Sequence, residues 1–169
     1  GRSGELLFVL VEHQYLNAQG LALTEEHDIV YRSAAQPGDP VPPPTKPPLH
    51  GQAAWSRTIA PDEVLLFRYS ALTFNGHRIH YDRKYVTEVE GYPGLIVHGP
   101  LIATLLLDLL RRSLPDAQLA RFDFRAVRPT TDLHPFSVHG KPSSDGKTVE
   151  LWAQDHEGWL TMQGTATLA

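Results

Sequence analysis

The sequence predicts an α+β domain, because one long apolar helix precedes a series of segments with the period of β-strands. Residues 100–113 hold good helix formers, with Pro100 in the first turn and Arg111 and Arg112 at the C-terminal end, where cations suit the helix dipole. Leucines cover most of the circumference of this segment. A helix that is apolar nearly all round is typically buried, so we expect the domain to be built around it.

The segments after this helix alternate with period two and are predicted to be antiparallel strands. They are separated by turns rich in Gly, Ser and Asp, and they span residues 118–128, 136–141, 147–156 and 159–168. Shorter elements are expected before the helix. A short helix or turn begins at Pro61, a second short helix runs from residue 82 or 83 to residue 90, and residues 91–99 form a loop.

The N-terminal part predicts a long hairpin followed by a linker. Residues 5–12 and 26–32 have the composition of strands, with turn residues at 17–20. A lone hairpin is marginal in water, so this one needs a sheet to join. Residues 37–48 contain seven of the fourteen prolines, which favours an extended linker over the alternative of a long surface loop.

A similar hairpin closes the chain at residues 148–168, and this weak internal repeat suggests a duplication. We therefore expect three parts. Residues 1–32 form the terminal hairpin of a truncated N-terminal domain, residues 33–50 form a Pro-rich linker, and residues 51–169 form the C-terminal domain.

Composition excludes several classes of protein. The chain has 169 residues, of which 41% are hydrophobic, so it is too apolar to be disordered. Its net charge of −4 argues against nucleic acid as a partner, because phosphate binding needs a basic surface. No apolar run reaches the ~18 residues of a membrane span, and the absence of cysteine removes disulfides and thiolate sites. With no signal peptide at its start, a cytoplasmic protein is expected.

The densest polar cluster lies at residues 69–82, with Asn75, His77, Arg78, His80 and Asp82 close together. Polar groups at this density are more typical of a pocket than of a core, although a solvated loop is the alternative. Three chemistries fit. His80 suits a general base, His77, His80 and Asp82 suit metal ligands, and Ser70 with a histidine suits a nucleophilic pair, although no G-x-S-x-G motif is present.

A second cluster, at residues 92–100, ends at Gly99 immediately before the buried helix. The first amides of a helix have no partner within it and present a positive dipole, so an oxygen that gains negative charge during a reaction can be stabilised there. The alternative is an ordinary N-terminal turn in which Gly99 permits tight packing.

The two clusters read F-x-Y-S-A-L-T-F-N-G-H-R-I-H-Y-D and, about ten residues later, Y-P-G-L-I-V-H-G-P-L. Together they resemble the MaoC-like enoyl-CoA hydratases of the hotdog superfamily. The resemblance covers residues 57–168 and is closest to the branch with two fused hotdog domains, which includes type 2 hydroxyacyl-thioester dehydratases and mesaconyl- or itaconyl-CoA hydratases. It implies a sheet wrapped around the helix of residues 100–113, with the opening hairpin as the end of the first hotdog.

The resemblance also implies site residues. The family motif has an aspartate, then a histidine five residues later, and these hold the attacking water. His80 matches the histidine, whereas Asn75 stands in place of the aspartate and is expected to orient water. Gly99 matches the glycine whose amide polarises the thioester carbonyl. We predict substrate-binding positions at Tyr69, Ser70, His77, Arg78, His98 and Arg125.

The implied function is reversible hydration of an enoyl-CoA thioester, without a metal or redox cofactor. The alternatives are a hotdog acyl-CoA thioesterase and a non-catalytic acyl-CoA-binding hotdog. An acyl-CoA is the expected small-molecule partner, with no nucleic acid or membrane partner. Because hotdog sheets have edges that can pair, a homo-oligomer, dimer or larger, is also expected.

Overall fold

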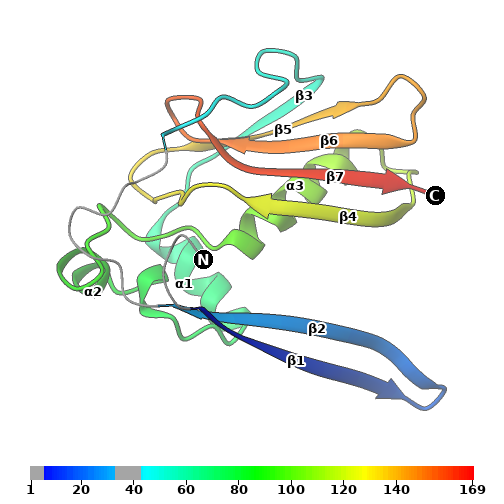
Figure 1. Ribbon diagram of the computed structural model, residues 1–169. Coiled ribbons are helices and arrows are strands. Elements are labelled where there is room, and N and C mark those ends of the chain that lie inside the picture. Colours follow the sequence, from blue (N-terminus) through cyan, green and yellow to red (C-terminus); the bar gives the residue numbers. More distant parts are fainter. Residues whose placement is uncertain (1–5, 33–42) are drawn as a thin grey trace. The chain divides into compact units, whose positions relative to one another are not determined.

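Residues 6–32 and 43–169 are described by the computed structural model, and the chain divides between Pro42 and Pro43 into two units. The first unit holds a two-stranded hairpin, and the second holds a five-stranded sheet with its helices (Figure 1). Most of the predicted linker and the start of the first predicted strand lie outside the described residues.

The hairpin consists of β1 (Leu6–Asn17) and β2 (Gly20–Arg32), paired antiparallel. Both strands are longer than predicted, because pairing continues through the polar stretch between them. There the Glu25 carboxylate accepts from Tyr15 Oη at 3.2 Å and lies 3.0 Å from His13 Nδ1. Such cross-strand pairs stabilise strand pairing in a segment whose sequence shows no alternation of apolar and polar residues.

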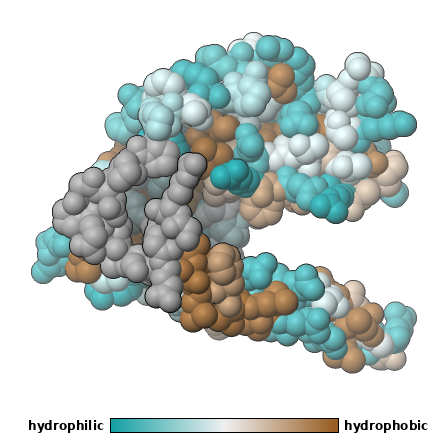
Figure 2. Space-filling view, viewed as in Figure 1, coloured by the Kyte–Doolittle hydropathy of each residue, from teal (hydrophilic) through white to brown (hydrophobic). Residues whose placement is uncertain are grey.

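Apolar side chains lie on both faces of the hairpin. Successive residues of a strand point to opposite faces, so Leu7 and Val9 share one face and Phe8 and Leu10 share the other. Phe8 is 64% exposed and Leu10 is 59% exposed, and Figure 2 shows the hairpin's apolar residues in brown. An exposed apolar surface of this kind is typical of an interaction surface.

The sheet of the second unit has the order β3-β5-β6-β7-β4, antiparallel throughout. Its strands are β3 (Trp55–Ile59), β4 (Leu119–Ala126), β5 (Phe136–Pro142), β6 (Thr148–Gln154) and β7 (Leu160–Leu168). The four strands after the helix are confirmed to within two residues at each end. The edge strand β3 was not predicted, because it is short and its middle residues are exposed and polar.

The long helix α3 (Gly99–Ser113) packs on one face of the sheet, against β3, β5 and β6. Leu106 is fully buried between them, within the main hydrophobic cluster. The expectation of burial nearly all round was too strong, because Thr104 is exposed and the partly exposed Asp108 binds Arg57, Arg111 and Arg112. In the described part of the chain, no helix is long and apolar enough to cross a membrane.

Three short helices precede α3. They are α1 (Glu63–Leu72), the 3-10 helix η1 (Arg78–His80) and α2 (Arg83–Glu88). The carboxylates of Asp62 and Asp82 cap α1 and α2 by accepting from Leu65 N and Tyr85 N. Because each cap satisfies an amide that the helix itself leaves unpaired, these two aspartates fix where the helices begin.

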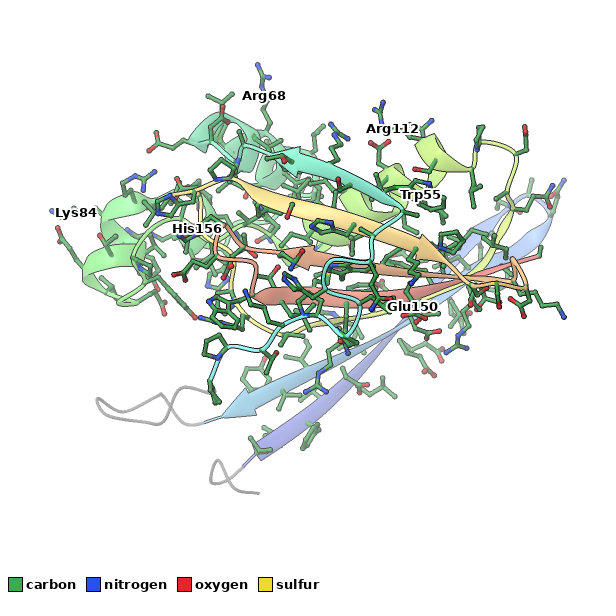
Figure 3. The ribbon with its side chains drawn as sticks, turned by 90° about the horizontal axis from the view of Figure 1, so that it is seen from above. Trp55, Arg68, Lys84, Arg112, Glu150 and His156 are labelled. Atoms are coloured by element: carbon green, nitrogen blue, oxygen red, sulfur yellow. The ribbon has the colours of Figure 1, made fainter. Side chains whose placement is uncertain are left out.

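Residues 43–54 run over the face of the sheet opposite α3. Thr45 O accepts from Leu160 N at 2.8 Å, and the Lys46 ammonium lies 4.0 Å from the centre of the Trp159 ring. Figure 3 looks down on this face and shows the segment that leads to Trp55 passing over the strands. The described part of the predicted linker, residues 43–50, is therefore fixed on the domain.

Candidate functional site

His80 ends η1 and is held by the extended segment that precedes α3. The Ile96 amide donates to the Ile79 carbonyl at 3.0 Å, and His80 Nδ1 lies 2.6 Å from the Ile96 carbonyl oxygen. Because a carbonyl oxygen can only accept, Nδ1 holds the proton. In the neutral imidazole, Nε2 then holds the lone pair that a general base needs.

Burial keeps this imidazole neutral. His80 is 8% exposed, and its desolvation lowers its pKa below the ordinary value of 6.5. The bond to the Ile96 carbonyl raises the pKa by less, and the nearby His77 lowers it further. Most of the His80 population is therefore able to accept a proton at neutral pH.

His98 stacks on His80 and is itself buried. The two ring centroids are 3.7 Å apart with planes inclined by 16°, and His98 Nε2 shares a 2.8 Å hydrogen bond with the Ser70 hydroxyl. Burial, followed by the neighbouring His80, lowers the pKa of His98 to about 4. The Tyr69 ring packs edge-on at 4.8 Å. A neutral His98 thus fixes the plane of the His80 ring from behind.

The alternative of Ser70 as a nucleophile does not fit this arrangement. The structure does bring a serine and a histidine together, but Ser70 is 6% exposed and His98 is 1% exposed. A nucleophile must reach the substrate, so this buried pair is better explained as support for His80.

The segment that holds His80 is fixed by a buried carboxylate. Asp132, whose side chain is 4% exposed, accepts from Leu95 N at 2.9 Å and from Arg83 at 2.5 Å. Arg83 also binds Glu63 at 2.6 Å. A Cβ on Gly94 would lie 2.8 Å from the Asp132 oxygen, so glycine is required there for this close approach.

Asn75 lies in the turn between α1 and η1. Its backbone N–H donates to the Ser70 carbonyl at 2.9 Å, and its side-chain Oδ1 accepts from His77 N at 3.0 Å. The His77 ring meets His80 edge-on, with 5.7 Å between centroids. The turn therefore brings the His77 ring to His80, and Asn75, which holds the His77 amide, keeps its side-chain NH₂ group and one lone pair for a further partner.

Gly99 opens α3 directly after His98. Among the described residues, a Cβ at Gly99 would meet nothing nearer than the Met162 Cε, at 3.9 Å. The alternative that Gly99 permits tight packing is therefore not supported. The room beside it leaves the amide at the helix start open to close approach by a ligand.

Two of the predicted substrate-binding residues, Arg78 and Arg125, lie outside the histidine cluster. Arg78 binds Asp82 at 2.7 Å and stacks on the Tyr85 ring, with 4.1 Å from its guanidinium carbon to the ring centre. Arg125 lies exposed on β4 and lines a separate hollow with Trp152 on the sheet. The structure therefore does not bring Arg78 or Arg125 into the histidine cluster.

The alternative metal site of His77, His80 and Asp82 finds little support in the geometry. Asp82 accepts from Arg78 and caps α2 through Tyr85 N, and His80 Nδ1 is engaged by a carbonyl. Within residues 6–32 and 43–169, no group of three His, Cys, Asp or Glu side chains is placed to hold a metal ion.

A cavity of about 290 Å³ lies beside Gly99 and was not predicted. Sequence reasoning missed Thr130 and Thr161 because threonine is common in strands and in the turns beside them. Arg128 follows the strand residues Arg121 and Arg125, and such a run of arginines usually forms a solvated face, so the sequence gives no sign that Arg128 lines a cavity. The cavity is lined by Ile96, Val97, Gly99, Ile102, Ala126, Val127, Arg128, Pro129, Thr130, Thr161 and Met162.

An antiparallel sheet around a central helix defines the class of this domain as a hotdog fold. Two solved structures have the same fold. The MaoC-like dehydratase from Phytophthora capsici has a TM-score of 0.71 at 15% identity, covering 98% of this chain and 60% of that one. HtdX from Mycobacterium tuberculosis has a TM-score of 0.67 at 19% identity, covering 96% of this chain and 67% of that one.

Residues 2–132 match the family model described as hydroxyacyl-thioester dehydratase type 2, and the chain belongs to this family. It is 48% identical over 171 residues to mesaconyl-C(4)-CoA hydratase of Chloroflexus aurantiacus, covering 99% of this chain and 58% of that protein. It is 38% identical over 89 residues to the mitochondrial hydroxyacyl-thioester dehydratase type 2 of Schizosaccharomyces pombe, covering 52% of this chain and 29% of that protein. The chain thus spans little more than half the length of the mesaconyl-C(4)-CoA hydratase and less than a third of the length of the yeast dehydratase. The predicted family resemblance is confirmed.

Proposed function

We propose that this chain provides the catalytic site for reversible hydration of a 2-enoyl-CoA thioester. The observation that carries the proposal is the neutral His80, whose Nδ1 proton is held by Ile96 O so that Nε2 is free to act as a base. The chain's 48% identity to a mesaconyl-C(4)-CoA hydratase supports the same reaction class. Mesaconyl- and itaconyl-CoA are therefore substrates to test beside crotonyl-CoA.

In the proposed reaction, His80 Nε2 removes a proton from water as the water oxygen forms a bond to C3 of the substrate. The electron pair of the C2–C3 double bond moves toward the thioester carbonyl. An enolate forms, and its oxygen carries the negative charge. The Gly99 amide and the α3 dipole stabilise that charge. The proton on His80 is then delivered to C2, which restores the carbonyl and neutral His80.

Asn75 has a positioning role in this proposal. An amide cannot exchange a proton as the aspartate of the wider family does, but its free NH₂ and remaining lone pair can orient the attacking water. His77 and Tyr69 then border the substrate, and Ser70 and His98 hold the His80 ring. Arg78 and Arg125 would act only on more distant parts of the substrate, because both lie outside the histidine cluster.

The test follows the loss of conjugated absorbance of the three enoyl-CoA esters by the purified protein. We expect turnover, and a loss of 10²- to 10⁴-fold in kcat for His80→Ala. The matched control is His156→Gln, since His156 lies at the turn between β6 and β7 (Figure 3) and stacks on His134 outside the site. No turnover by the wild-type protein, or equal turnover by His80→Ala, contradicts the proposal. Thiol release from butyryl-CoA would indicate a thioesterase instead.

We also propose an assembly of two hotdog units, in which residues 1–32 belong to the end of the first unit, residues 33–50 connect, and residues 51–169 form the second. The exposed apolar groups on both hairpin faces support this, because a lone hairpin leaves them in water and needs further strands or a packed helix to be stable. The proposed setting is cytoplasmic and needs no cofactor other than the CoA ester. Light scattering should give a dimer or larger species, and a monomer with a rapidly exchanging hairpin would contradict it.

A further inference from the structure

The cavity beside Gly99 contains polar groups whose hydrogen-bonding capacity is unused. Arg128 Nη1, Thr130 Oγ1 and Thr161 Oγ1 are buried and have no hydrogen-bond partner among the described residues. Thr130 is 4% exposed and Thr161 is fully buried. All three residues line the same cavity as Gly99. Buried polar groups are ordinarily paired, so this concentration of unpaired ones needs an explanation.

The backbone fixes these groups around the start of α3. Val97 N donates to Thr130 O at 2.8 Å, and the amides of Val127 and Arg128 donate to Thr161 O at 2.8 and 3.2 Å. The positions of Thr130 and Thr161 therefore follow from main-chain bonds rather than from side-chain partners. This arrangement is a preorganised polar site, since the hydroxyls need no rearrangement before they bind.

The charge of the cavity indicates an anionic ligand. Arg128 is the one charged side chain among its lining residues, and none of them is acidic. Other arginines of the described chain, such as Arg57, Arg83 and Arg121, are bound by carboxylates. A partly buried guanidinium without a counter-charge is costly, and a carboxylate is the partner that fits its planar donors best.

Mesaconyl-CoA, proposed above as a substrate, carries a second carboxylate on its acyl group. We propose that Arg128, with Thr130 and Thr161, is the site that binds this carboxylate, and that these three residues set a preference for it over a methyl group. This inference rests on the proposed function, which places the thioester carbonyl at Gly99. The small cavity next to Gly99 then receives the acyl group, and its apolar lining of Ile96, Ile102 and Met162 contacts the hydrocarbon part. With the thioester carbonyl at Gly99, the CoA phosphates are a whole pantetheine arm away, so the acyl carboxylate is the anion expected in this cavity.

The experiment compares two substrates that differ only at the end of the acyl chain, crotonyl-CoA with a methyl group and fumaryl-CoA with a carboxylate. We expect the wild type to prefer fumaryl-CoA in kcat/KM. In Arg128→Met the ratio of the two kcat/KM values should fall about 10- to 100-fold toward crotonyl-CoA, the range expected for a charge-assisted hydrogen bond. The control is Arg121→Met, because Arg121 binds Asp123 on exposed β4 and is expected to leave the ratio unchanged.

Binding without turnover separates this inference from the proposed reaction. Calorimetry measures the binding of succinyl-CoA, butyryl-CoA and free CoA. In Arg128→Met, the affinity for succinyl-CoA alone should fall, and in Thr161→Val it should fall to a smaller extent. If no enoyl ester is hydrated but this selectivity is found, the proposed reaction fails and the carboxylate site stands. If crotonyl-CoA is hydrated but neither variant changes the ratio or the selectivity, the carboxylate site is wrong. An equal loss of affinity for all three ligands would mean that Arg128 binds the CoA moiety, and this result would also overturn the proposed carboxylate site.

Discussion

Two polar regions of the domain use their hydrogen-bonding groups in opposite ways. In the histidine cluster, Ser70 binds His98 Nε2 and Ile96 O binds His80 Nδ1, so the protein itself fixes both rings, although His98 Nδ1 is also buried with no partner among the described residues. In the cavity of Arg128 and Thr161, the corresponding groups are buried with no partner among the described residues. A fixed base suits proton transfer, whereas unused donors suit a ligand that arrives with its own acceptors.

The largest expected effect is the pH dependence of stability, which tests whether His98 is held neutral. The unfolded pKa is near 6.5 and the folded pKa is about 4, so between these values the unfolded chain binds more protons. The contribution of neutral His98 to the free energy of unfolding is therefore fully present above pH 6.5. It is lost as the pH falls toward 4, and the total loss is roughly 3 kcal/mol. The lowered pKa of His80 acts in the same direction.

Urea denaturation at a series of pH values measures this loss. His98→Gln should flatten the dependence between pH 6.5 and 4, whereas His134→Gln, at an exposed position, should keep it. An unchanged slope in His98→Gln would show that His98 is protonated in the folded protein.

The next effect concerns Gly99, which belongs to both regions. Gly99→Ala places a methyl group in the open space beside the helix start, 3.9 Å from Met162 Cε, which is an ordinary contact. Stability should be unchanged or slightly higher, because alanine favours a helix more than glycine does. We expect kcat/KM on the preferred enoyl-CoA to fall about 10- to 100-fold, since small misplacements of a substrate are costly. Full activity in this variant would mean that no ligand approaches Gly99 closely.

Ser70→Ala removes the side-chain partner of His98 and should cost about 1–3 kcal/mol in the free energy of unfolding, because a buried ring nitrogen loses its bond. The double variant Ser70→Ala/His98→Leu should recover part of that loss, since both polar groups are then gone. A double variant that is less stable than either single one would assign the cost to packing volume rather than to the hydrogen bond.

The smallest expected effect is a gain in stability, rather than a loss, when the unpaired hydroxyl of Thr161 is removed. Thr161→Val keeps the side-chain shape and removes an oxygen that is buried without a partner in the described structure. The free energy of unfolding should stay the same or rise by up to about 1 kcal/mol. Thermal unfolding without ligand checks this, and a loss above 1 kcal/mol would indicate that the hydroxyl is already paired in the free protein.

The unit with residues 6–32 shows where sequence patterns stop being informative. Its strand type was correctly predicted, but the strands extend through polar residues that pair across the hairpin, such as Tyr15 and Glu25. Edge strand β3 was missed for a related reason. Pairing with a neighbouring strand, and not its own apolar period, defines it.

The sequence by itself determined the elements whose signals are local. These are α3 with its proline and arginine ends, the four strands that follow it, and the family motifs around His80 and Gly99. Side-chain period and helix-end residues act over a few positions, so they can be recognised without knowledge of the fold.

Only the tertiary structure decided which polar groups are paired. Ser70 and His98 are 28 positions apart, and Thr161 is 33 positions from Arg128, yet each pair shares one small region. Whether a buried hydroxyl has a partner depends on atoms brought together by the sheet and by the path of the chain around α3. The free base on His80 and the unpaired donors beside Gly99 are properties of that assembled geometry, because burial and hydrogen bonding are set by neighbours in space.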